Sequence, residues 1–520
     1  MFELPWRRLW PPWRMELEAM IPGRLLWGDL HNHNEIGYAQ GSLERSYDIA
    51  ESHLDFYAFT PHGQNTDGSN LTHYPVVDDR WSEVQEAAKS RNRPGEFTSF
   101  LAYEWHSTPW GHVHVVYGDD DMPLEKTTTL TELLTIMRSR DAILIPHHTA
   151  YRGGVDWELR DAQLSPLVEI FSEHGSSERD IGLHAMLGHS GGPGDHRFTV
   201  QAGLEAGHRV GFTAGTDNHD GYPGGYGLGL TGVFADSNCR EDILRALRQR
   251  RTVAVTGDRI EIQYFCGTAP LGSVVEPGHG DLTYTVRGWD FIKTVELLRD
   301  GVPVAVRVPD YQSEIPEVGR YRLRLEYGWG PMKGYQVYDW RGQIEIDAGV
   351  IEHVAPCFVS DPFDEARRKR IDGWSPAQVS WQSHTSRGGW LTTRNGTPYC
   401  SANDAICLEI TGTPETVLRL HLDNKTVTSL VATQPDWTHT PRPGALDVEV
   451  TLGDLLAGRR GFSMEGSPNS VVFHRAVPEA LYSIHGAHTP RPTDAACYYL
   501  RVTQENGQMA WASPIWIDAG

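Results

Sequence analysis

The first half of the chain alternates short apolar runs with helix-forming stretches, and this alternation constrains the fold more than any other feature of the sequence. The apolar runs up to about residue 260 are RLLWGDL, LDFYAFT, FTSFLAYEW, HVHVVYG, AILIP, LVEIFS and RVGFTAG. Helices are expected at 43–53, 79–92, 130–139, 196–208 and 240–250, with Asp79 and Thr129 as N-caps. Apolar strands that alternate with helices are typical of a parallel sheet buried on both faces. Six or seven such units predict an α/β fold, as a closed or nearly closed β/α barrel.

The second half has a different pattern. Short alternating segments such as LTYTVRGW, GQIEIDA and YYLRVTQ are separated by turn residues, which is typical of an antiparallel β-sandwich. ENGQ at 505–508 predicts a tight hairpin turn between YYLRVTQ and MAWASPIWI. Since 520 residues are enough for two domains, we expect the following division. It comprises an N-terminal arm at 1–22, the barrel at 23–258, and the sandwich at 259–520 with a loop-rich excursion near 360–400.

The overall charge limits the partners of the chain. Its formal net charge of -22 repels phosphate backbones, so we expect no nucleic-acid partner. No stretch approaches the ~20 apolar residues of a membrane span, and the N-terminus does not resemble a secretion signal. None of the six cysteines forms a CxxC pair, so we expect reduced thiols in a cytoplasmic protein. The expected partner is a small-molecule substrate, with homo-oligomerisation left open.

Histidines and carboxylates cluster where a β/α barrel keeps its active site, at the ends of the strands. Sixteen of the 24 histidines fall within residues 1–220. Because side chains alternate along a strand, an HxH pair places both rings on one face. Neutral imidazoles combined with carboxylates suit Zn, Mn or Fe. The side chains at or beside the strand ends are His31, His33, His62, Glu104, His112, His114, His147, His148, Glu169, Asp217 and His219.

These motifs resemble the PHP superfamily, named for polymerase and histidinol phosphatase domains. The matching segments are GDLHNHNE, FTPHG, AYEWHS, GHVHVVY, IPHHTA and AGTDNHDG. Segments 246–260 and 498–517 are similar to a large uncharacterised branch of PHP-domain hydrolases, so the resemblance spans nearly the whole chain. It implies a distorted seven-stranded β/α barrel that binds two or three divalent metal ions.

The resemblance also implies a ligand set. The first metal ion would be held by His31, His33, Glu104 and Asp217. Glu104 would bridge to a second ion held by His112 and by either His147 or His148. The third would be held by His62 and His219.

One position departs from the family pattern. Many PHP proteins carry Asp or His about seven residues after the first motif histidine, where this chain has Tyr38. The third metal ion could be absent, bind weakly, or recruit Glu35 or Gln40. Without it, His62 and His219 become candidate proton donors or substrate contacts.

The favoured interpretation is a metal-dependent hydrolase in which a metal-bound hydroxide attacks a phosphoester. A carboxylester, lactone, amide or carbamate could be cleaved by the same site. The alternative class is an inactive barrel whose sandwich binds a carbohydrate or a protein partner. Glu169 could orient a ligand histidine, and His114 is as well explained as a hydrogen-bonded core residue. The catalytic candidates are Asp217, His219 and His62, and the substrate-binding candidates are Arg152, Tyr151, His174 and Tyr38.

Overall fold

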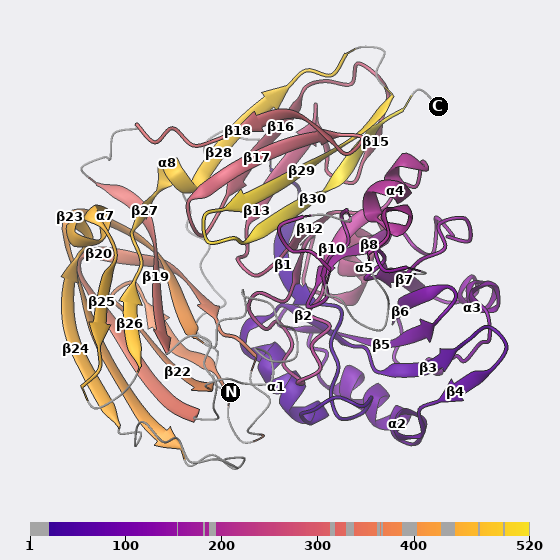
Figure 1. Cartoon of the computed structure of the whole chain (residues 1–520), viewed down its shortest axis with the longest axis horizontal. Coiled ribbons are helices and arrows are strands. Elements are labelled where there is room, and N and C mark those ends of the chain that lie inside the picture. Colours follow the sequence, from indigo (N-terminus) through magenta and orange to yellow (C-terminus); the bar gives the residue numbers. More distant parts are fainter. Residues whose placement is uncertain are drawn as a thin grey trace. The chain divides into compact units, whose positions relative to one another are not determined.

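The structure is a computed structural model that describes residues 20–152, 154–179, 182–186, 194–312, 318–328, 337–360, 365, 368–386, 403–427, 443–465, 469–491 and 495–518. These residues form a strand-rich, mixed α/β fold with several sheets and few helices (Figure 1). They pack into two compact units. The smaller unit contains Trp289–Phe291 and Pro309–Ser483, and the larger contains Ala19–Gly288, Ile292–Val308 and Ile484–Gly520. Strands from 259–520 therefore enter both units. The domain boundaries expected from the sequence remain a prediction.

The larger unit is built on a mixed sheet rather than a wholly parallel one. Its strands β1 (Arg24–Asp29), β2 (Phe56–Phe59) and β5 (Thr98–Ser107) run parallel, as expected. However, β6 (Gly111–Tyr117) is antiparallel both to β5 and to β7 (Ala142–His147). Only three residues join β5 to β6, whereas a parallel crossover needs about a dozen. The expectation of an all-parallel sheet is therefore wrong at this hairpin.

The same sheet continues from β1 through strands that are distant in sequence. Its order from β1 is β11, β12, β30, β29, β17 and β18. The bounds of these strands are β11 (Leu230–Ala235), β12 (Thr252–Val255), β30 (Met509–Ile517), β29 (Ala496–Gln504), β17 (Ile292–Arg299) and β18 (Val302–Arg307). The predicted turn at 505–508 joins β29 to β30 as an antiparallel hairpin. Because β30 pairs with β12, the C-terminal hairpin extends the sheet of the first half of the chain.

The sheets do not close into a barrel in the described residues. The strands β8 (Leu167–Ser172) and β10 (Gly211–Ala214) pair in parallel, and with β9 (Gly175–Ser176) they form a sheet of their own. No backbone ladder joins that sheet to the larger one among these residues. The other strands of this unit are β3 (His62–Thr66), β4 (Leu71–His73), β13 (Glu261–Cys266), β14 (Ala269–Pro270), β15 (Val274–Val275), β16 (Leu282–Arg287) and β28 (Ser483–His488). The closed form of the predicted barrel is therefore not confirmed.

The helices of the larger unit fall close to their expected positions. They are α1 (Leu43–His53), α2 (Pro75–Ser90), α3 (Leu130–Met137), η2 (His196–Phe198), α4 (Val200–Glu205) and α5 (Arg240–Arg248). Thr129 caps α3 as predicted, since its side chain accepts from the backbone N–H of Glu132. The predicted cap at Asp79 is wrong, because proline fits the first turn of a helix and α2 already begins at Pro75. Thr199 interrupts the helix expected over 196–208 and caps α4.

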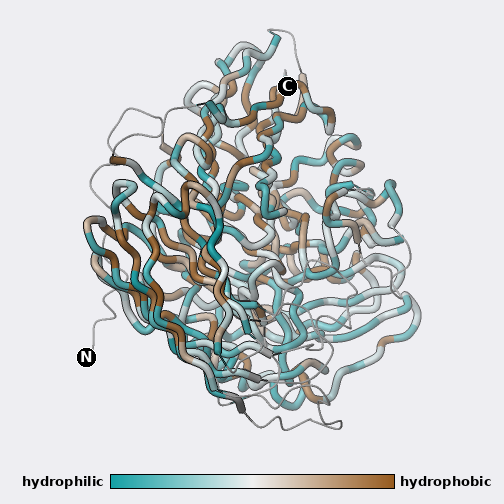
Figure 2. The backbone as a smooth tube through the Cα atoms, turned by 60° about the vertical axis from the view of Figure 1, so that its left-hand side comes forward, coloured by the Kyte–Doolittle hydropathy of each residue, from teal (hydrophilic) through white to brown (hydrophobic). Residues whose placement is uncertain are grey.

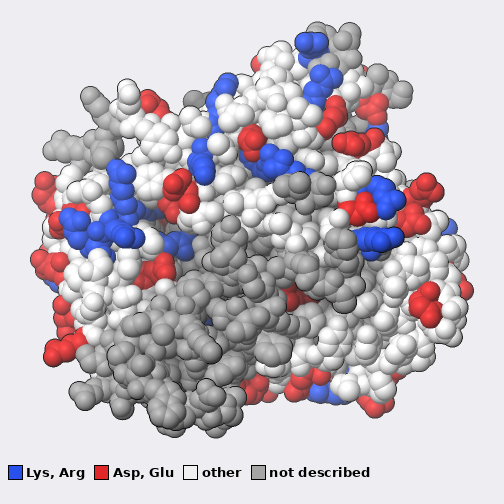
Figure 3. Space-filling view, viewed as in Figure 1, with Lys and Arg blue, Asp and Glu red and all other residues white. Residues whose placement is uncertain are grey.

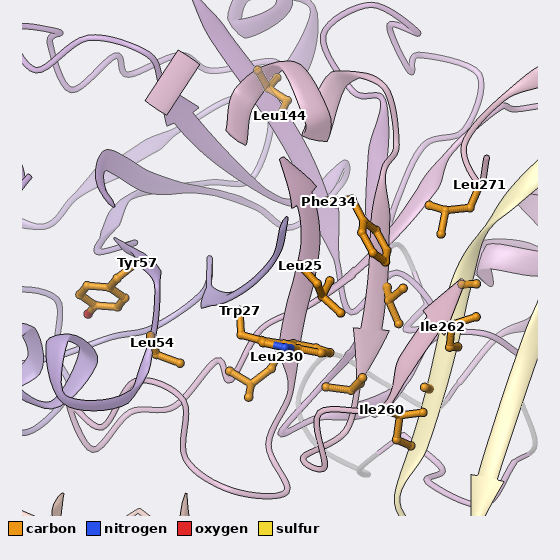
Figure 4. Close-up of a cluster of buried hydrophobic side chains, with 14 of the residues drawn as sticks. Leu25, Trp27, Leu54, Tyr57, Leu144, Leu230, Phe234, Ile260, Ile262 and Leu271 are labelled. Atoms are coloured by element: carbon orange, nitrogen blue, oxygen red, sulfur yellow. The ribbon is translucent and has the colours of Figure 1, made fainter. Parts of the chain in front are cut away.

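Both faces of the central sheet are buried. From β1, Leu25 and Trp27 join one apolar cluster, whereas Leu26 joins a second cluster on the opposite face. Figure 4 shows Leu25 and Trp27 beside Leu230 and Phe234 of the neighbouring β11. Figure 2 shows brown, hydrophobic stretches interspersed with teal ones along the described chain. Burial on both faces explains why the predicted strands read as continuous apolar runs.

The smaller unit contains a nine-stranded sheet in which every described strand pair is antiparallel. Its elements are β19 (Gly319–Gly328), β20 (Val337–Cys357), β21 (Arg370–Ser375), β22 (Gln378–Ser386), β23 (Asp404–Val427), β24 (Gly444–Thr451), α7 (Leu452–Ala457), β25 (Arg460–Ser463), β26 (Ser470–Phe473), β27 (Val477–Pro478) and α8 (Glu479–Tyr482). The antiparallel pairing expected for this part of the chain is confirmed.

Several expectations fall on residues that the structure does not describe. The N-terminal arm at 1–22 lies outside the described residues up to residue 19, and so does much of the excursion near 360–400. The described part of that excursion includes the antiparallel pair β21–β22. Among the described residues, no helix is both long and apolar enough to cross a membrane.

Candidate metal centre

The ends of several strands of the larger unit bring imidazoles and carboxylates together. His31 and His33 follow β1 directly, and Asp217 lies in the loop after β10. Both rings face the same oxygen, since Oδ1 of Asp217 lies 3.1 Å from Nε2 of His31 and 3.2 Å from Nε2 of His33. The expectation that the HxH pair shares one face is therefore confirmed.

Glu104 lies at the centre of the cluster and divides it into two groups. Its Oε2 atom lies 3.4 Å from Nε2 of His33 and 3.4 Å from Nε2 of His62. Its Oε1 atom lies 2.8 Å from Nδ1 of His112 and 3.3 Å from Nε2 of His147. The carboxylate is 1% exposed, so water does not compete for these oxygens. A carboxylate with nitrogen donors on both oxygens has the arrangement needed to bridge two cations.

Within the described residues, several overlapping groups of side chains place potential ligand atoms within 4.8 Å of one another. They include His31, Glu104, His114 and His147; His33, His62 and His219; His112, His147 and His148; His31, His33 and Asp217; and His62, Glu104 and His106. Both ring nitrogens of His33 and of His114 are buried without a hydrogen-bond partner among the described residues. Leaving buried polar atoms unpaired is costly, so these residues fit divalent metal ions as their missing partners.

Glu169 of β8 orients one of these rings. Both of its carboxylate oxygens lie 3.1 Å from Nδ1 of His31, so Nε2 of that ring is directed toward Asp217. A Cβ atom at Gly215 would lie 2.4 Å from Cβ of His31 and 2.7 Å from Oε2 of Glu169, which explains the glycine. Burial raises the pKa of Glu169 to about 7, although His31 opposes the shift. Carboxylate partners of this kind fix the orientation of metal-ligating histidines.

A second chain of contacts reaches Asp217 from its other oxygen. Oδ2 of Asp217 lies 3.0 Å from Nε2 of His174, and Nδ1 of His174 lies 3.1 Å from the hydroxyl of Tyr151. Nδ1 of His219 donates to the backbone oxygen of Asp217 at 2.9 Å and lies 3.7 Å from Oε1 of Glu173. Asp217 adopts a φ of 51°, a conformation that is uncommon outside glycine. Its surroundings therefore hold this carboxylate in one orientation.

The protonation of part of the cluster suits cation binding. Carboxylates beside His31 and His219 raise the pKa of these two rings against the effect of burial, so a cation would have to displace their protons. Burial lowers the pKa of His33 to about 4 and that of His147 to about 3, so both rings are neutral at pH 7. Burial would raise the pKa of Glu104, but the neighbouring His62 and His147 hold it well below its ordinary value. Neutral imidazoles and ionised carboxylates are the forms that bind divalent metals.

The remaining predicted residues lie at different distances from the cluster. Tyr38 is 59% exposed, yet its hydroxyl lies 3.1 Å from Nε2 of His62. Glu35 forms an ion pair with Arg80 instead of facing the histidines. Arg152 is exposed, and no hydrogen bond or ion pair joins it to the cluster within the described residues. The structure thus brings Tyr151, His174 and Tyr38 to the centre but does not bring Arg152 there.

His106 and His114 are members of the cluster that the candidate ligand set omits. They belong to the hairpin of β5 and β6, where Glu104 pairs with His114 and His106 pairs with His112. The ring centroids of His106 and His112 are 3.5 Å apart. Glu104 and His106 on one strand, like His112 and His114 on the other, are two residues apart, so in a short hairpin their side chains share one face. Because parallel strands were expected here, this shared face was not predicted.

Comparison with protein families gives a partial match. Residues 47–142 and 211–272 match DUF3604, a family described as a protein of unknown function. An uncharacterised protein of Chlamydia pneumoniae is 27% identical over 312 residues, which cover 55% of this chain and 49% of that protein. An uncharacterised protein of Chlamydia muridarum is 27% identical over 316 residues, again 55% of this chain and 49% of the relative. The chain spans about half the length of these curated relatives.

One solved structure is similar over part of the chain. It is the crystal structure of a two-domain protein from Bacteroides vulgatus that contains a predicted PHP-like metal-dependent phosphoesterase. It is 14% identical, and the match covers 58% of this chain and 84% of that one with a TM-score of 0.34. A similarity this low establishes neither a shared fold nor a shared activity.

Proposed function

We propose that this protein is a metal-dependent hydrolase of the PHP type that acts on a phosphoester. The observation that carries the proposal is the position of Glu104, whose two buried oxygens face separate groups of imidazoles. The centre would hold two or three divalent ions, of Zn, Mn or Fe. In this proposal β1, β2, β5 to β8 and β10 belong to a distorted β/α barrel, and the centre lies at its rim.

The residues have distinct roles in this proposal. Divalent ions lower the pKa of bound water and polarise a phosphoryl oxygen. His31, His33, Glu104 and Asp217 would hold the first ion, and Glu104 with His112 and with His147 or His148 would hold the second. His62 and His219 complete a third position or, without an ion there, transfer a proton to the leaving group. Tyr151, His174 and Tyr38 would contact the substrate.

The proposed partner is a small molecule. The net charge of -22 disfavours nucleic acids, and Figure 3 shows acidic and basic side chains interspersed over the described surface of one face. We place the protein in the cytoplasm because its free cysteines, of which Cys266, Cys357, Cys407 and Cys497 are buried, need no oxidising environment.

The first experiment measures metal content per chain by inductively coupled plasma mass spectrometry. Freshly purified protein should carry two or more Zn, Mn or Fe ions per chain, and the His31→Ala/His33→Ala double variant should lose at least one of them. His73→Ala is the matched control because this histidine is exposed. Content near zero, unrecovered after incubation with each ion, would refute the proposal.

The second experiment identifies the bond that is cleaved. The metal-loaded protein is assayed against phosphoester, carboxylester, lactone, amide and carbamate substrates. Activity on phosphoesters that disappears in both Glu104→Ala and Asp217→Asn supports the proposal. Activity confined to carbonyl substrates would replace the phosphoester with that class. Binding of a carbohydrate without turnover of any substrate would favour the inactive alternative.

A further inference from the structure

A network of buried polar side chains joins the C-terminal hairpin to the turn after β8. Oε1 of Glu178 accepts hydrogen bonds from the hydroxyl of Tyr499 at 2.8 Å and from Nη1 of Arg501 at 2.9 Å. Nε of Arg501 donates at 2.8 Å to Oε2 of Glu296 on β17. Glu178, Tyr499 and Arg501 are all at most 5% exposed, and such charge-assisted bonds are strong when buried.

Glu178 lies four residues after His174, at the end of the turn that reaches the metal centre. This turn places Nε2 of His174 at 3.0 Å from Oδ2 of Asp217, and Oε1 of Glu173 at 3.7 Å from Nδ1 of His219. Backbone hydrogen bonds already tie Glu173, Ser176 and Ser177 of this turn to residues outside it. The network at Glu178 adds side-chain hydrogen bonds to the last residue of the turn from more than 300 residues away in sequence.

The hairpin contacts this region at two further points. Nε2 of His184 donates at 2.9 Å to the backbone oxygen of Gly507, in the turn between β29 and β30. Phe171 at the end of β8 stacks on Trp511 of β30, with ring centroids 6.2 Å apart. The hairpin therefore contacts residues both before and after His174.

We propose that Tyr499 and Arg501 are positioning residues of the metal centre. Through Glu178 they hold the turn at 173–178, so that His174 and Glu173 meet Asp217 and His219. The C-terminal hairpin then stabilises the arrangement of the centre, although none of its residues touches a candidate ligand in the described structure. The reference to a metal centre rests on the proposed function, whereas the support of the turn does not.

The first test is hydrogen exchange of backbone amides in the full-length, metal-free protein. Tyr499→Phe removes the hydroxyl that donates to Glu178 and accepts from Nε2 of Gln201, and Glu178→Gln removes the negative charge of the acceptor. Both variants leave the packing volume nearly unchanged. Tyr498→Phe is the matched control, because its ring lies in a different apolar cluster on the other side of β29. Exchange at 173–178 should accelerate about tenfold in the first two variants and not in the control. Equal rates in all three variants would overturn the proposal.

The second test connects the turn to the metal centre through the visible absorption of bound Co²⁺. The spectrum of Tyr499→Phe should differ from wild type, and that of Tyr498→Phe should match it. Accelerated exchange with an unchanged Co²⁺ spectrum would overturn the link to the centre. A wild-type protein that binds neither Co²⁺ nor any other divalent ion would refute the proposed function, while the exchange rates would still decide whether the hairpin holds the turn.

Discussion

Both carboxylate oxygens of Glu169 lie 3.1 Å from Nδ1 of His31, and this hydrogen bonding directs Nε2 of the ring toward Asp217. We predict that Glu169→Gln weakens metal binding about 10- to 100-fold, because the amide cannot hold the ring in one tautomer. Competition with a chromogenic chelator measures the affinity. The exposed Glu158→Gln serves as control and should bind like wild type. Wild-type affinity in Glu169→Gln would show that orientation of His31 does not limit binding.

Tyr38 lies beside the group of His33, His62 and His219, in which the nearest carboxylate to His33 and His62 is the shared Glu104. Its hydroxyl is 3.1 Å from Nε2 of His62, and its φ of 60° is better tolerated by Asp or Asn than by Tyr. We predict that Tyr38→Asp carries more metal per chain than Tyr38→Asn, since a carboxylate would complete the ligands His33, His62 and His219. Mass spectrometric metal analysis measures the difference. Equal content in the two variants would argue against a third metal position.

The metal-free protein should lose stability in mild acid. Six histidines of the cluster have a lowered pKa, namely His33, His62, His106, His114, His147 and His148. Below the ordinary value of 6.5 they bind protons in the unfolded chain but not in the folded one, so falling pH favours unfolding. Glu169, whose pKa is raised to about 7, acts in the opposite direction. His31, His174 and His219, whose pKa values are also raised, oppose the effect too, but these four groups are outnumbered.

Thermal unfolding of chelator-treated protein measures this effect. The melting temperature should fall steadily between about pH 6.5 and pH 4.5. Burial lowers the pKa of His106 to about 3, so His106→Gln should make the fall less steep. A melting temperature that is independent of pH over this range would contradict the prediction.

The smaller unit contains a buried ion pair whose loss should be costly. Nη2 of Arg322 donates to Oε2 of Glu409 at 2.6 Å, and the guanidinium lies 4.0 Å from the ring centroid of Trp289 and 4.7 Å from that of Tyr482. Glu409→Gln removes the negative charge of this partner from beside the buried guanidinium, which should cost about 3–5 kcal/mol in the free energy of unfolding.

Chemical denaturation measures this cost. The exposed pair of Arg419 and Glu449 lies on the same sheet, so Glu449→Gln is the matched control and should cost about 0.5 kcal/mol or less. Similar costs for Glu409→Gln and Glu449→Gln would show that the buried pair contributes no more than a surface pair.

Local features of the fold could be predicted because they depend on residues close together in sequence. Each of the seven apolar runs contains a strand, and α1 and the N-cap of α3 at Thr129 were identified from periodicity and a single threonine. Errors arose where local rules compete, as at Pro75, which starts α2 four residues before Asp79. The separate strands β11 and β12 were not assigned, since each is a short apolar run without a distinctive flanking motif.

The sequence by itself determined that imidazoles and carboxylates would gather at strand ends, because HxH and DxH spacing fixes side chains on one face of an extended chain. Only the tertiary structure decided that β6 turns back on β5, which brings His106 and His114 to Glu104. It also decided that the C-terminal hairpin pairs with β12 and contacts Glu178. Strand order and pairing across hundreds of residues depend on which surfaces pack together in space, and no local spacing encodes that choice.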